Sequence, residues 1–114
     1  MAADGSMTPG FSFALDAARD VFPGVKPGRL VLALLATIRP VPEWNGCRIF
    51  VDDQYANDDD TIGVQVDGRA AASVREHLAT AFRNAGIPVH EAMVDLAAGS
   101  DEALAEARDG RWIE

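Results

Sequence analysis

The chain has 114 residues, of which 48% are hydrophobic and 25% are charged. This composition is typical of a soluble globular protein and excludes a disordered, collagen-like or disulfide-stapled chain. Acidic residues outnumber basic ones by 18 to 10, and the net charge of -8 disfavours direct binding to nucleic acid, because such a surface repels phosphate. The length fits one domain. We expect residues 1–10 to be a disordered leader and residues 11–114 to be a single α+β domain.

The use of cysteine and lysine indicates the cellular compartment and the kind of genome from which the chain comes. Cys47 is the only cysteine, so no intramolecular disulfide forms and a reducing cytoplasm is expected. Lys26 is the only lysine among the ten basic residues, a bias typical of GC-rich bacterial or phage genes. No apolar run approaches the roughly 20 residues that span a bilayer, so no membrane contact is expected.

The first part of the chain is predicted to contain two helices. Apolar residues recur at helical spacing over residues 12–22, until a Pro-Gly pair ends the pattern. Residues 29–38 are apolar on every side, which predicts a buried helix, although periodicity alone does not distinguish it from a buried strand. Pro40 and Pro42 then favour an extended conformation.

Two strands and a long helix follow. Residues 47–52 are β-branched and aromatic, and residues 61–67 alternate between apolar and polar side chains. Both patterns predict strands, and their closeness in sequence favours antiparallel pairing. Residues 67–86 keep apolar side chains at helical spacing throughout, so we expect a helix that is capped by Asp67 and stopped at Gly86.

The last part of the chain is predicted to hold one strand and one helix. Residues 87–96 form a third strand whose apolar register shifts, which indicates a bulge or a late start at Ala92. Ser100 is expected to cap a helix that runs to Asp109 and ends at Gly110. The predicted order is therefore α-α-β-β-α-β-α. It describes a small α+β sandwich, a three-stranded mixed sheet with helices on one face, in which a right-handed crossover makes the last two strands parallel.

The first candidate site is a cluster of five carboxylates in and beside the loop between the first two strands: Asp52, Asp53, Asp58, Asp59 and Asp60. Oxygen ligands at this density suit Mg²⁺, Mn²⁺ or Ca²⁺, and no other cofactor is indicated. The spacing departs from an EF-hand, because Ile62 and Arg69 stand where ligands belong. Asp52 and Asp60 could meet across the two strands. The alternative is a solvated loop.

The second candidate site combines one cysteine with the two histidines: Cys47, His77 and His90. These residue types form Cys-His nucleophilic pairs and three-ligand zinc sites, which also need an orienting carboxylate such as Glu76 or Glu91. The spacing does not enforce their convergence. Each residue also has an ordinary structural interpretation, the cysteine as a small buried hydrophobe and the histidines as boundary or solvent-facing side chains.

The third candidate is a set of apolar side chains at positions that look exposed: Trp44, Trp112 and Ile113. The first follows the proline-rich stretch, and the other two lie close to the end of the chain, where residues fray unless they dock. Tryptophan is enriched at interfaces. These side chains therefore either pack on the protein's own core or contact a partner.

We found no convergent catalytic motif, so the main expectation is a non-catalytic binding or assembly module. It would act through protein–protein contacts, by self-association or as an accessory subunit. One alternative is a metal-dependent enzyme or metal-binding protein that uses the acidic cluster. Another is an acidic nucleic-acid mimic that blocks the basic groove of a DNA-handling protein.

Overall fold

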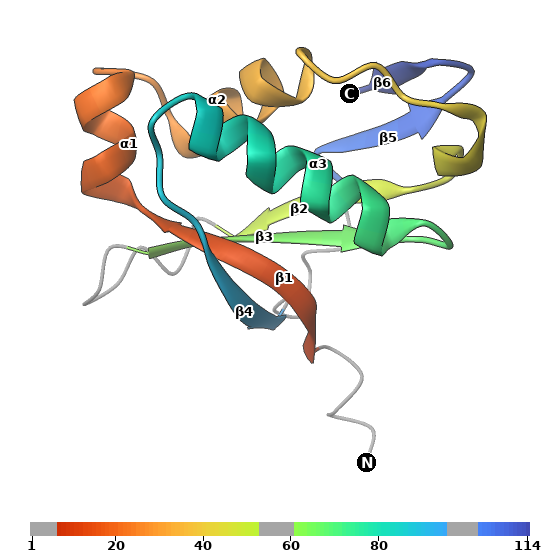
Figure 1. Ribbon diagram of the computed structural model, residues 1–114, viewed down its shortest axis with the longest axis horizontal. Coiled ribbons are helices and arrows are strands. Elements are labelled where there is room, and N and C mark those ends of the chain that lie inside the picture. Colours follow the sequence, from red (N-terminus) through yellow and green to blue (C-terminus); the bar gives the residue numbers. More distant parts are fainter. Residues whose placement is uncertain (1–6, 53–60, 96–102) are drawn as a thin grey trace.

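The computed structural model describes residues 7–52, 61–95 and 103–114. In these ranges three α-helices lie on one side of a six-stranded sheet (Figure 1). The strands are β1 (Met7–Ala14), β2 (Arg48–Asp52), β3 (Thr61–Asp67), β4 (His90–Asp95), β5 (Ala105–Arg108) and β6 (Arg111–Ile113). The helices are α1 (Leu15–Val21), α2 (Pro27–Leu35) and α3 (Ala71–Asn84), with a short 3₁₀ turn, η2 (Pro42–Trp44).

The sheet has the strand order β4-β1-β3-β2-β5-β6, and all neighbouring strands run antiparallel. Because β1 lies between β3 and β4, those two strands point in the same direction without pairing. From β1 to β4 the chain therefore has the split β-α-β, or ferredoxin-like, topology, with two helices in its first crossover. The β5–β6 hairpin extends the sheet beyond β2.

β1 is the main departure from the expected fold. Residues 7–10, expected in a leader, and residues 12–14, expected in a helix, both belong to this strand. Phe11 and Phe13 are 2% and 0% exposed, while Ser12 between them is only half-buried, which is the alternation of a strand. The insertion of β1, with the added hairpin, gives a six-stranded antiparallel sheet in place of the expected three-stranded mixed one, and the expected parallel pair is separated.

The end of the chain forms a hairpin where a helix was expected. β5 and β6 are joined by Asp109 and Gly110, with φ angles of 53° and 78°. Positive φ at both central residues is the geometry of a type I′ turn, for which Asp-Gly is a preferred sequence. Pairing of β5 with β2 overrides the helix propensity of its Ala-rich sequence. Residues 100–102 of the expected helix lie outside the described residues.

The other expected elements are present. β2 and β3 pair antiparallel, and α2 confirms that residues 29–38 begin as a helix. β4 lies within the third predicted strand but begins at His90 and pairs with β1 in an unbroken register, so it has neither the expected bulge nor a start at Ala92. α3 ends before Gly86, whose φ is +92°, as an αL stop requires. The start of α3 differs from the prediction. Its N-cap is Ala70, without a side-chain hydrogen bond, whereas Asp67 forms an ion pair with Arg48 at 3.1 Å.

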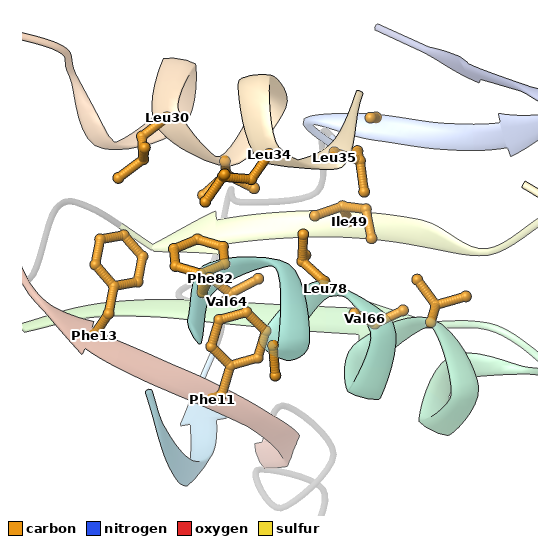
Figure 2. Close-up of a cluster of buried hydrophobic side chains, with 14 of the residues drawn as sticks. Phe11, Phe13, Leu30, Leu34, Leu35, Ile49, Val64, Val66, Leu78 and Phe82 are labelled. Carbon is orange, nitrogen blue, oxygen red and sulfur yellow. The ribbon is translucent and has the colours of Figure 1, made fainter. Parts of the chain in front are cut away.

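The core lies between the helices and the sheet (Figure 2). Phe82 of α3 is fully buried, and its ring centroid lies 5.3 Å from that of Phe11 and 4.9 Å from that of Phe13. α2 adds Leu30 and Leu35, which are each 1% exposed. Burial of a side chain of this size contributes about 1.5–3 kcal/mol, so this layer fixes α2 and α3 on the sheet.

Candidate functional site

Only one residue of the acidic cluster lies in the described part of the chain. Asp52 ends β2 and pairs with Gly63 of β3, whereas Asp53, Asp58, Asp59 and Asp60 lie outside the described residues. Within the described ranges, no three His, Cys, Asp or Glu side chains are grouped so that they could hold a metal ion. The metal-dependent enzyme depends on this cluster, whereas the nucleic-acid mimic depends on the net charge of -8. Both stay predictions.

The cysteine and the two histidines have three different environments. Cys47 is fully buried against Gly68, where an added Cβ would lie 2.9 Å from the cysteine Sγ. His77 is exposed on α3, and His90 is exposed on β4, where it pairs with Ser12 of β1. Across the described residues these three side chains form no metal-holding group. Cys47 has the packing of a small hydrophobe.

The two tryptophans lie together and pack on the protein's own core. Trp44 is 4% exposed, and its ring centroid is 6.2 Å from that of Trp112. The Trp112 indole N–H donates to the Ile38 carbonyl at 2.7 Å, which ties β6 to the segment after α2. Ile113 follows Trp112 in β6 and is half-buried on the opposite side of that strand. Of the two alternatives, packing on the protein's own core and contact with a partner, the structure shows the first for both indole rings.

The segment that leads into Trp44 is rigid. Pro40 and Pro42 each have a fixed φ, and Val41 between them is extended, with φ -102° and ψ 162°. The backbone N–H of Trp44 donates to the Val41 carbonyl at 2.9 Å, and its indole N–H donates to Ser73 Oγ at 3.3 Å. These bonds fix the indole between η2 and α3.

His77 lies beside this indole, with a ring-centroid distance of 5.0 Å and an interplanar angle of 68° to Trp44. Its Nδ1 is 2.8 Å from the Ser73 carbonyl oxygen. A carbonyl oxygen only accepts hydrogen bonds, so Nδ1 carries the hydrogen. In the neutral ring, Nε2 is then left as an acceptor whose orientation the Nδ1 bond fixes.

These residues line a cleft of about 420 Å³, which we call the Trp44 cleft. Its apolar lining comes from Ile38, Val41, Trp44 and Ala70. Its polar lining comes from Arg39, Glu43, Ser73 and His77. Small-molecule pockets typically have volumes of about 300–1,000 Å³ and combine apolar walls with a few polar groups. The Trp44 cleft has both properties.

Two opposite charges on the rim of this cleft form no ion pair with the described part of the chain. Arg39 and Glu43 are exposed, and neither forms an ion pair with any described residue. Val41 lies between them in sequence and is 41% exposed. None of the three was a predicted site residue. The sequence signal that could have revealed them is the Pro-Val-Pro segment, which is flanked by Arg39 and Glu43. In the structure this segment holds the side chain of Val41 in solvent between the two charged residues.

Two further cavities are mostly polar. One, of about 210 Å³, lies between α3, β1 and β4, and both Arg75 and Glu91 line it. The other, of about 340 Å³, lies on the strands β2, β5 and β6. The arginines that line it, Arg48 and Arg108, are already ion-paired. Neither lining contains a tryptophan, so the Trp44 cleft is the stronger candidate.

No helix in the described ranges is long and apolar enough to cross a membrane. Comparison of the chain with protein-family models, curated proteins and solved structures gives no significant match. A functional conclusion therefore rests on the geometry of the site.

Proposed function

We propose that this chain is a non-catalytic module that acts through protein–protein contacts and that the Trp44 cleft is its contact site. The observation that carries the proposal is the combination on one rim of an exposed aliphatic side chain, Val41, with two opposite charges, Arg39 and Glu43, that form no ion pair among the described residues. A partner that covers the valine also reaches both charges. The valine contributes apolar burial, and the charges contribute specificity.

The rigidity of the rim supports the proposal. Association costs free energy for every side chain and backbone segment that becomes ordered on binding. Here Pro40 and Pro42 restrict the backbone before binding, and two hydrogen bonds already fix Trp44. The backbone of the rim and the Trp44 indole therefore lose little conformational entropy when a partner docks.

The proposal is tested by selecting peptides from a random display library against the immobilised full chain. Affinities of the enriched peptides are then measured by intrinsic fluorescence, because Trp44 lies in the cleft. Val41→Glu places a charge on the rim and is expected to weaken binding by about tenfold or more. Val25→Glu is the matched control, because Val25 is 39% exposed and does not line the cleft.

The expected result is a set of enriched peptides that bind the wild type and Val25→Glu equally and lose affinity for Val41→Glu. Selection that enriches no peptide would overturn the proposal. Enriched peptides that bind Val41→Glu as tightly as the wild type would overturn it as well, since their site would lie elsewhere.

A further inference from the structure

The rim segment Arg-Pro-Val-Pro-Glu is charge-symmetric about its central valine. Arg39 and Glu43 stand two residues before and two residues after Val41, and all three line the Trp44 cleft. This symmetry is one of sequence order, because Val41 is extended whereas Glu43 lies in the 3₁₀ turn η2. In a second copy related by a two-fold axis near Val41, each arginine would lie toward a glutamate and the two valines toward each other. A two-fold axis through Val41 therefore makes this segment complementary to itself.

We infer that the rim of the Trp44 cleft contacts a second copy of this chain in a two-fold dimer centred on Val41. The inference rests on the proposed function and names its partner. Two Arg39–Glu43 pairs and one valine–valine contact would form at the centre of the interface. Both charges lack a partner among the described residues of the single chain, so no ion pair described there has to break before the dimer forms.

Side chains must carry this contact, because the backbone cannot extend a sheet here. Pro40 and Pro42 have no N–H to donate, and the Val41 carbonyl already accepts from the Trp44 backbone. Edge-to-edge strand pairing is therefore disfavoured at this segment. Charge reversal on the two rim residues should consequently control the association.

The dimer is expected to be weak and reversible. The central contact is small, and interfaces below about 1,200 Å² belong to transient complexes. The net charge of -8 on each copy also opposes association. Measurement at ~0.15 M salt, where the Debye length is about 8 Å, screens that long-range repulsion more than the close pairs.

The test is sedimentation equilibrium of the full chain up to about 1 mM, with charge-reversal variants. Arg39→Glu alone and Glu43→Arg alone each create two like-charge contacts in the dimer, so each should weaken association by about tenfold or more. In an equimolar mixture of the two variants, every rim contact is attractive again and the dimer should return. The double variant R39E/E43R should also dimerise like the wild type.

Matched controls separate this geometry from net charge. Arg29→Glu and Asp20→Arg make the same charge changes at exposed positions of α2 and α1 that do not line the cleft. Both should dimerise like the wild type. The mixed variants Arg39→Glu and Glu43→Arg remain negatively charged overall, so recovery of their dimer cannot come from opposite net charges. Circular dichroism and urea midpoints confirm that each variant is folded.

A wild-type chain that stays monomeric to about 1 mM would overturn the inference. So would a mixture of Arg39→Glu and Glu43→Arg that fails to dimerise, or controls that weaken the dimer as strongly as the rim variants. If these results appear while selected peptides still depend on Val41, the second copy is excluded and the proposed function stands. If the Val41-dependent peptides are absent too, both proposals fail.

Discussion

Gly68 is a position at which the addition of one methyl group should clearly lower the free energy of unfolding. Its φ is +131°, a conformation that residues with a Cβ rarely adopt. A Cβ built there would lie 2.9 Å from both the Cα and the Sγ of Cys47. Cys47 is itself fully buried immediately before β2 and cannot move into solvent. Gly68→Ala therefore combines backbone strain with a steric overlap in the core.

The two effects set the expected magnitude. Backbone strain of this kind costs about 1–3 kcal/mol, and overpacking of a filled core costs about 1–3 kcal/mol. Alanine also reduces the conformational entropy of the unfolded chain, which offsets about 0.4–1 kcal/mol of this loss. The free energy of unfolding should thus fall by about 1–5.6 kcal/mol. This is a large share of the stability of about 5–15 kcal/mol that is typical of a domain.

Gly46→Ala is the matched control, because Gly46 has φ +90° and no atom within 4 Å of an added Cβ. It should lower the free energy of unfolding by about 1 kcal/mol through strain alone. Urea unfolding followed by tryptophan fluorescence measures both variants. Equal losses for Gly68→Ala and Gly46→Ala would refute the reasoning. In a Cys47→Ala background the penalty at Gly68 should shrink but persist, because the overlap with the backbone of residue 47 remains.

Three further substitutions test the core packing, a hydrogen bond and an ion pair of the fold. Phe82→Ala removes the ring that packs on β1 and should lower the free energy of unfolding by about 3–5 kcal/mol in urea titrations; a loss below about 1 kcal/mol would contradict the described core. Trp112→Phe leaves the Ile38 carbonyl without its donor and should cost about 1–2 kcal/mol by thermal unfolding; unchanged stability would show that the bond does not anchor β6. Asp67→Ala should cost less than about 1 kcal/mol, because its ion pair with Arg48 is exposed and it does not cap α3; a larger loss, measured by urea unfolding, would restore the capping role.

Local patterns in the sequence are sufficient for β2, β3 and α3. Residues 61–67 alternate without interruption, and residues 71–84 keep helical spacing over a long run. These elements depend on contacts between near neighbours, and β2 and β3 pair because they are close in sequence. Their existence and their pairing could therefore be predicted.

Long-range pairing explains what could not be predicted. β1 begins with a Thr-Pro-Gly sequence that resembles a leader, and its position in the sheet depends on β4, about eighty residues away. β5 has an Ala-rich sequence with helix propensity and becomes a strand because β2 offers it an edge. The Asp109-Gly110 pair is the local signal for this hairpin, but a glycine there is equally typical of the end of a helix.

The residues of the candidate site also include one that could be predicted from the sequence and several that could not. Trp44 was predicted as a possible contact residue because of its type and its place after the prolines. Ser73 and His77 reach it only through the packing of α3 against η2. The importance of Arg39 and Glu43 lies in their lack of partners among the described residues, which becomes visible only when the surroundings of both side chains are known.

The central claim is that the Trp44 cleft is the surface through which this protein makes contacts. NMR spectroscopy of the ¹⁵N-labelled full chain tests it most directly, with spectra recorded as the chain concentration rises and as selected peptides are added. The indole N–H of Trp44 and the amides of Val41 and Glu43 should shift progressively, while the amides of β4 stay constant. Signals of the cleft that remain constant in both titrations, with or without shifts at β4, would contradict the claim.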